Sequence, residues 1–199
     1  MRSLVLILCS VAFWFMGYNA VTTAFSKYAT AVWAVEEKTA SNCLLVATAV
    51  ATLSFWPVGL LSSRIGRKKT ILCGASALAV CFLLAGFVKG LGAPMFILFG
   101  LVGIAWASIN VNSFPMVVEL ASGADTGKYT GYYYTFSMAA QVLTPVLSGW
   151  LLDAFGYQTL FPYAAVMVAL SVVTMSQVRH GDAKPAAPAG LEAFDAGDD

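Results

Sequence analysis

The octapeptide GLLSSRIG at residues 59–66 has a counterpart, GWLLDAFG, at residues 149–156. Each begins and ends with glycine, each carries a small polar or acidic residue at its fifth position (Ser63 and Asp153), and each closes an apolar run. The two copies lie 90 residues apart. Self-similarity at a fixed spacing predicts an internal repeat of the fold.

Outward from these two octapeptides, the chain consists of apolar runs separated by short polar loops. Of its 199 residues, 59% are hydrophobic and 11% are charged, whereas a soluble domain has about half and about a quarter. The runs are continuous and do not alternate, which predicts membrane-spanning helices and excludes a barrel. We therefore expect an all-α, polytopic membrane protein with six spans, at about 4–25, 42–61, 71–88, 95–118, 130–152 and 160–178.

The octapeptides end the second and the fifth run, so each repeat holds three spans. An odd number of spans gives the two repeats opposite orientations in the membrane. Inverted three-helix repeats build each half of a major facilitator transporter. Residues 59–69, GLLSSRIGRKK, also resemble the loop motif of that superfamily, G-x-x-x-D-R-x-G-R-[RK].

The resemblance implies that this loop is a conformational latch at a membrane surface. Its glycines let helix ends approach closely, and its basic side chains can pair with a carboxylate or with a helix C-terminus. Ser63 departs from the motif, which has Asp there, while the second copy keeps the acid. The expected latch residues are Gly59, Arg64, Gly66, Arg67, Lys68 and Asp153.

Residues 14–20 and 106–115 resemble the first and fourth spans of the C-terminal half of sugar:cation symporters. That resemblance implies a transporter of twelve spans, of which residues 1–178 supply the last six. We therefore expect a partner, either a missing N-terminal six-helix half or a second copy of this chain. A half-size protein that homodimerises and a non-transporting membrane scaffold stay open as alternatives.

Polar side chains within the spans mark the faces that meet protein or water, because lipid excludes them. In the fifth run they recur at spacings of 3 and 4 residues, from Thr130 to Ser148, which predicts one stripe lining a cavity. Amides and aromatic rings suit the hydroxyls and apolar faces of a neutral sugar. We expect solute contacts from Tyr18, Asn19, Trp106, Asn110, Tyr134 and Gln141.

A proton or sodium symporter needs a titrating carboxylate in its pathway. Between Leu4 and Val118 the acidic residues are Glu36 and Glu37, which lie in a loop, so Glu119, near the end of the fourth run, is the one candidate. It is either a coupling group or an interfacial carboxylate that pairs with loop arginines. If the protein is a symporter, H⁺ or Na⁺ would be the coupling ion.

Basic residues stay on the cytoplasmic side of short loops. Placing the 64–69 loop inside puts eight basic residues inside and three outside, so both termini are expected to be cytoplasmic in a cell-membrane protein. Residues 179–199 are rich in Ala, Pro, Gly and Asp, which predicts a disordered cytoplasmic tail.

Other function classes are disfavoured by what the chain lacks. Its net charge of +1 gives no footprint for nucleic acid. The four cysteines are single and apolar in context, and the one histidine follows the last run, so we expect no metal, no cofactor and no enzyme activity.

Overall fold

The computed structural model describes residues 2–121 and 125–179. The expected tail at 179–199 lies, apart from Arg179, outside the described residues. Six helices long and apolar enough to cross a membrane occupy the described ranges, which confirms the all-α class. Their bounds are α1 (Arg2–Trp33), α2 (Glu37–Ile65), α3 (Arg67–Ala85), α4 (Ala93–Val118), α5 (Thr126–Phe155) and α6 (Leu160–Ser176), with a short 3₁₀ turn, η2 (Tyr157–Thr159), before α6.

Several helices run beyond the apolar runs that predict them. The first continues to Trp33 because its last turns are buried: Phe25 and Tyr28 pack with Phe161 of α6, at ring-centroid distances of 6.1 and 5.1 Å. The start of α2 is joined to α1 by a 3.1 Å hydrogen bond between the hydroxyls of Ser26 and Ser41. Packing therefore extends these helices through polar residues near their ends, which is why the apolar runs alone predict helices that are too short.

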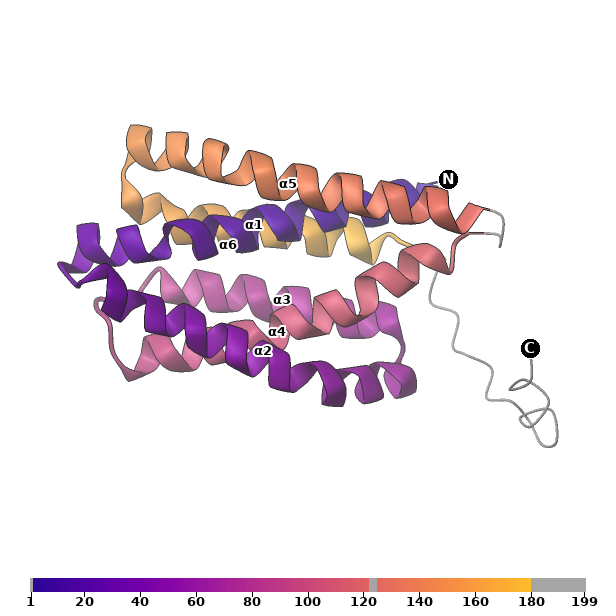
Figure 1. The fold of residues 1–199 in the computed structure, drawn as a ribbon, viewed down its shortest axis with the longest axis horizontal. Coiled ribbons are helices and arrows are strands. Elements are labelled where there is room, and N and C mark those ends of the chain that lie inside the picture. Colours follow the sequence, from indigo (N-terminus) through magenta and orange to yellow (C-terminus); the bar gives the residue numbers. More distant parts are fainter. Residues whose placement is uncertain (1, 122–124, 180–199) are drawn as a thin grey trace.

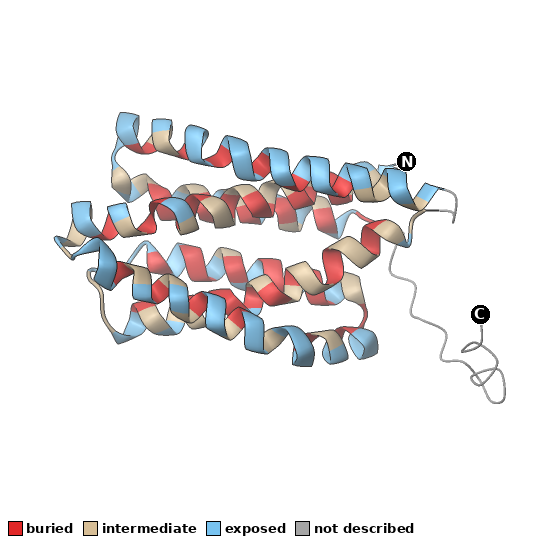
Figure 2. Cartoon of the chain, in the orientation of Figure 1, coloured by how far each residue is buried: buried red, intermediate tan, exposed pale blue. Residues whose placement is uncertain are grey.

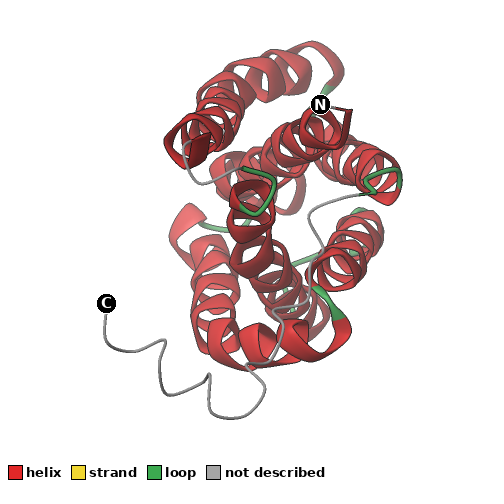
Figure 3. Cartoon of the chain, turned by 90° about the vertical axis from the view of Figure 1, so that its right-hand side faces the viewer, coloured by secondary structure: helices red, strands yellow, loops and turns green. Residues whose placement is uncertain are grey.

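The helices form two groups of three, α1 with α5 and α6, and α4 with α2 and α3 (Figure 1). The groups meet mainly where α3 packs against α6, with smaller contacts between α1 and α2 and between α4 and α5. The first helix of each repeat thus packs on helices of the other repeat. The view along the bundle shows the two groups stacked one above the other (Figure 3).

The two glycines that close the octapeptides adopt the same backbone conformation. Gly66 has φ 99° and ψ 145°, and Gly156 has φ 88° and ψ 157°. Each donates its N–H to the carbonyl four residues earlier, at 2.9 Å, and then turns the chain into the next helix. Within the described residues they are the glycines with positive φ, and this region of φ is open to glycine at little cost. The internal repeat predicted from the sequence is therefore present in the backbone.

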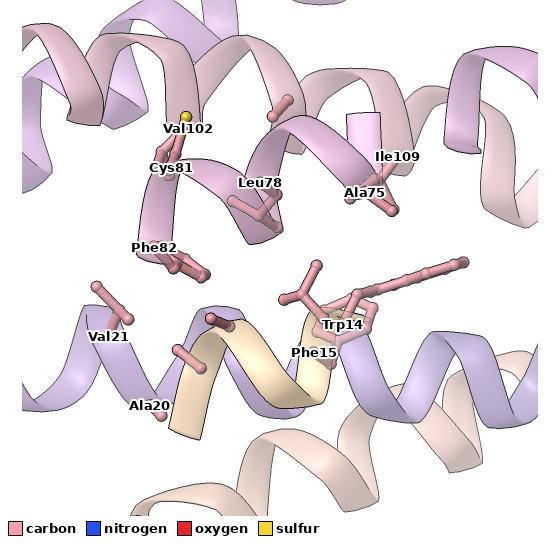
Figure 4. Close-up of a cluster of buried hydrophobic side chains, with 14 of the residues drawn as sticks. Trp14, Phe15, Ala20, Val21, Ala75, Leu78, Cys81, Phe82, Val102 and Ile109 are labelled. Atoms are coloured by element: carbon pink, nitrogen blue, oxygen red, sulfur yellow. The ribbon is translucent and has the colours of Figure 1, made fainter. Parts of the chain in front are cut away.

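The core lies where α1, α3, α4 and α6 meet. Figure 4 shows Trp14, Phe15 and Val21 of α1 facing Leu78 and Phe82 of α3 across this centre. Glycines permit the closest helix crossings: a Cβ on Gly17 would lie 2.8 Å from the carbonyl oxygen of Ala164 in α6. Small residues at crossings are the usual means of packing helices in membranes.

The outer faces of α2 and α5 carry large apolar side chains that no other described residue covers. Figure 2 shows both helices mostly pale blue, with burial confined to the side facing the bundle. The exposed apolar side chains include Leu53, Trp56, Val142, Val146 and Trp150. These faces meet lipid or another helical unit.

Candidate functional site

Two aromatic rings join α1 to α4 at the middle of the bundle. Tyr18 stacks on Trp106 with ring centroids 3.7 Å apart and planes 3° from parallel. Phe15, one turn of α1 away, meets the same indole edge-on at 5.2 Å. Tyr18 and Trp106 are half-buried, so the stack is ordered by the core and still reaches the surface.

This stack continues along α4 toward α5. Trp106, Asn110 and Phe114 are four residues apart and share one face of α4. Phe114 contacts the ring of Tyr134 in α5, at 5.7 Å between centroids. Two turns further along α5 stands Gln141, which is exposed like Tyr134. We call this surface the polar-aromatic face and define it by Tyr18, Asn19, Trp106, Asn110, Tyr134 and Gln141.

The amides of this face retain hydrogen-bonding capacity. Asn19 and Asn110 each donate one N–H to the backbone carbonyl four residues earlier, at 2.8 and 3.0 Å, and Gln141 donates to that of Ser137 at 3.3 Å. A side-chain amide has two N–H donors and a carbonyl acceptor. Each therefore keeps a donor and an acceptor for a bound solute, while the bond to its own helix fixes its orientation.

The polar stripe expected along α5 is divided by the fold. Ser137, Thr144 and Ser148 are buried on the side of α5 that packs within the bundle, and Tyr134 and Gln141 are exposed. Thr144 bonds the carbonyl of Ala140, and Ser137 bonds that of Tyr134. Small hydroxyl residues satisfied in this way allow close helix contact. The expectation that the whole stripe lines a cavity is therefore not met by Ser137 and Thr144, which are buried against the bundle, whereas Ser148 borders a cleft of about 200 Å³.

Trp14 lies one turn of α1 before Tyr18 and behaves differently. The spacing of four residues predicts that the two side chains share a face of the helix, but that of Trp14 is fully buried in the core. It points between the helices (Figure 4). A polar ring atom does not by itself distinguish a cavity residue from a core residue, because indole is mostly apolar surface.

A small cleft adjoins the stack between α1, α2, α3 and α4. Its volume is about 110 Å³, and its polar lining comes from Tyr18, Thr22 and Thr48. Sequence reasoning missed Thr48. The signal was a pair of threonines four residues apart, Thr48 and Thr52, in an otherwise apolar run.

We call one end of the bundle the basic end, because it carries Arg2, Arg64, Arg67 and Lys68. Charged groups connect three helices there. Arg67, at the start of α3, forms an ion pair with Glu119 at the end of α4. Lys68 donates to the carbonyl oxygens of Ser176 and Val178, at 3.0 and 2.5 Å, where α6 ends. A cation at a helix C-terminus is electrostatically favourable.

The remaining residues of the expected latch are spread over both ends of the bundle. At the basic end, Arg64 is exposed and Gly59 is half-buried. A Cβ added to Gly59 would lie 3.7 Å from a methyl carbon of Val111. Asp153 lies at the opposite end, because the second repeat is inverted. It lines a cleft of about 200 Å³ with Lys27 and Tyr157. The six residues therefore do not form one cluster.

Glu119 lies beyond the polar-aromatic face, toward the basic end. It follows Trp106 by 13 residues and Asn110 by 9, which are roughly 20 and 14 Å along a helix. Its side chain is 28% exposed and is paired with Arg67. This placement matches the interfacial role more closely than a role beside the solute.

Known proteins resemble this chain in sequence and in fold. The Major Facilitator Superfamily matches residues 4–195. The chloramphenicol resistance protein CraA of Acinetobacter baumannii is 30% identical over 122 residues, which cover 61% of this chain and 29% of that protein. A structure of the peptide transporter POT in complex with alafosfalin superposes with a TM-score of 0.81 at 16% identity, covering 97% of this chain and 43% of the other.

The proton:xylose symporter XylE, bound to 6-bromo-6-deoxy-D-glucose, superposes with a TM-score of 0.73 at 14% identity over 89% of this chain and 45% of its own. This chain thus spans less than half the length of each of these proteins. The superpositions on the solved structures establish the fold, and the family match over residues 4–195 establishes the family. The chain belongs to the major facilitator superfamily.

Proposed function

We propose that this chain is a six-helix half of a secondary transporter that moves a small neutral solute, a sugar or a related polyhydroxylated compound, by alternating access. The observation that carries the proposal is the polar-aromatic face. It presents an ordered Tyr18–Trp106 stack beside amides that each keep a free donor and acceptor. Membership in a superfamily of transporters supports this over an enzyme.

The chemistry of the face favours an uncharged ligand. None of its six residues is ionised at neutral pH. Amides match hydroxyl groups, which also donate and accept, and flat rings match the apolar faces of a pyranose. A charged solute would lose its hydration there without gaining a counter-charge.

A second six-helix unit is part of the proposal. The cleft beside Tyr18 holds about 110 Å³, and binding pockets for small molecules hold about 300–1,000 Å³. This chain therefore supplies one wall of a pocket, and an N-terminal half or a second copy supplies the other. Coupling to H⁺ or Na⁺ would then use a carboxylate of that second unit, since Glu119 is paired with Arg67.

Solute uptake by the intact transporter tests the face. Asn110→Leu and Gln141→Leu should each abolish uptake and leave the amount of protein in the membrane unchanged. Ser76→Leu is the matched control, because Ser76 is exposed on α3, outside the face. Normal uptake in both amide variants would refute the assignment of the face.

A second candidate solute class is a flat, weakly polar compound. The stacked rings of Tyr18 and Trp106 favour it, and the curated relative is named for chloramphenicol resistance. A panel of labelled sugars and chloramphenicol, each with and without a protonophore, separates the two classes. Transport of sugars alone supports the first class, and efflux of chloramphenicol alone supports the second.

The partner is identified by the mass of the solubilised complex. A mass of two copies supports a half-size homodimer, and a complex with a different six-helix chain supports a divided transporter. A monomer that transports nothing would support the alternative of a membrane scaffold.

A further inference from the structure

A cavity lies at the basic end of the bundle, the end that faces the viewer in Figure 3. It measures about 1,000 Å³ and opens between the start of α1, the start of α5 and the end of α6. Its polar lining comes from Arg2, Ser3, Lys68, Tyr129, Ser176, Gln177 and Arg179. Neither the polar-aromatic face nor the Arg67–Glu119 pair contributes to it.

Among the described residues, the lining carries three cations and no carboxylate. Arg2 and Arg179 are exposed, and neither has a partner among residues 2–121 and 125–179. Two such guanidinium groups on the lining of one cavity give it a positive potential that attracts an anion. A guanidinium binds a phosphate through two parallel hydrogen bonds, so these arginines favour a ligand that carries a phosphate over an uncharged ligand.

The end of α6 also borders the cavity. The carbonyl end of α6 would oppose an anion, but Lys68 already occupies the carbonyls of Ser176 and Val178.

The rest of the lining is apolar and comes from Leu4, Leu6, Leu120 and Val178. A bare inorganic ion would leave this part of the cavity unfilled. A phosphate ester places its anionic group by the arginines and its organic part against the leucines. Basic pockets between membrane helices are known to take lipid head groups.

We propose that this cavity is a binding site for a phosphate ester, carried either by an anionic phospholipid or by a small soluble metabolite. Arg2 and Arg179 hold the phosphate, and the apolar lining contacts the carbon chain of the ester. The site is separate from the proposed solute path, so it can exist whether or not this chain transports a sugar.

The test measures ligand binding to the purified full chain. Phosphatidylglycerol and phosphatidylcholine are compared by lipid retention in native mass spectrometry, and glycerol 3-phosphate by calorimetry. We expect phosphatidylglycerol or glycerol 3-phosphate, or both, to bind, and phosphatidylcholine to bind at least about tenfold more weakly. Binding of the lipid alone identifies a lipid site, and binding of the soluble ester alone identifies a metabolite site.

Variants connect the binding to the cavity. Arg2→Gln with Arg179→Gln should weaken binding about tenfold or more, and the two Arg→Lys changes should weaken it less, because charge is kept and bidentate geometry is lost. The matched control is Lys69→Gln with Lys128→Gln, which removes two exposed charges from the same end, outside the lining. Binding in the control should stay within about twofold.

Three results would overturn the proposal: no binding of either ester, equal loss in the control, or unchanged binding in the arginine variant. The acidic side chains of residues 180–199 provide a further check, since they follow Arg179 directly. They are Asp182, Glu192, Asp195, Asp198 and Asp199. These acids are converted to amides in the full chain, and the arginine variant is made again in that background. If it then binds the ester as well as its parent does, the arginines act by pairing with these acids, and the phosphate site is refuted.

Discussion

At the scale of single residues, Gly103 sets the distance between α4 and α2. A Cβ at this position would overlap the carbonyl oxygen of Ala47 and lie 3.0 Å from the nitrogen of Ala51. Backbone atoms cannot move aside as a flexible side chain can. Gly103→Ala should therefore lower the free energy of unfolding by about 1–3 kcal/mol, measured by denaturant titration in detergent.

Gly100→Ala is the control for that change. Gly100 lies on the same helix, and a Cβ there meets nothing within 4 Å. Alanine favours a helix over glycine by about 1 kcal/mol, so this variant should be equal to or more stable than the parent. Equal destabilisation of both variants would mean that the α2–α4 contact is looser than the structure has it.

The aromatic stack allows a second prediction at this scale. Trp106→Leu removes the flat surface under Tyr18 while keeping an apolar side chain, and should weaken solute affinity about tenfold, whereas Trp106→Phe keeps a ring and should weaken it less. The measurement is the concentration dependence of uptake by the intact transporter. Equal affinities in both variants would exclude ring contact with the solute.

Single residues are also where sequence reasoning was least certain. Tyr18 and Trp14 share a helix and a polar-aromatic character, yet one reaches the surface and the other is fully buried. Helical spacing gives the angle of a side chain around its helix. It does not give the angle at which the neighbouring helix arrives, and that angle decided which hydroxyls of α5 were buried.

At the scale of elements, Gly156 offers a test of the repeat. Its φ of 88° is strained for any residue with a Cβ, although no atom lies within 4 Å of that position. Gly156→Ala should therefore cost about 1–3 kcal/mol of stability through backbone strain alone. Gly149→Ala, in open space on helical backbone of α5, should cost nothing. Thermal unfolding of the two variants compares them directly, and equal stability would argue against the turn as described.

The elements themselves were predictable for a physical reason. A span must be apolar over a length set by the membrane, so the six runs are visible in the sequence, and the glycine spacing marks the turns that end the second and fifth helices. The helix ends were not predictable to the residue. Contacts such as that of Tyr28 with Phe161 join positions far apart in the chain, and no local pattern reports them.

At the scale of the whole molecule, the orientation in the membrane can be measured. We expect the basic end to face the cytoplasm, since basic loops are retained there. In a version without its native cysteines, Lys69→Cys should resist a membrane-impermeant maleimide added to intact cells, and Lys89→Cys, at the other end of α3, should react. The reverse pattern would invert the topology, and lysed cells, in which both should react, control for accessibility.

The sequence predicts the family and the architecture of the whole molecule but not its ligand. Six spans, an inverted repeat and the loop motif together identify half of a major facilitator fold. The identity of a solute depends on the shape of its pocket, and under the proposal above this chain contributes one wall of that pocket. The cleft at Tyr18, which takes side chains from α1, α2, α3 and α4, could not be assembled without knowing how these helices cross.

The inverted repeat places unlike chemistry at its two equivalent turns, and this makes the bundle respond unevenly to ionic strength. After Gly66 come Arg67 and Lys68, with the Arg67–Glu119 pair 25% and 28% exposed and so open to counterions. After Gly156 comes the uncharged sequence Tyr-Gln-Thr. Between 0.01 and 1 M electrolyte the screening length falls from about 30 to about 3 Å, which weakens the ties after Gly66 and leaves the turn after Gly156 unchanged. The salt concentration on one side of the membrane would therefore govern how easily the helix contacts made by Arg67 and Lys68 on that side are broken.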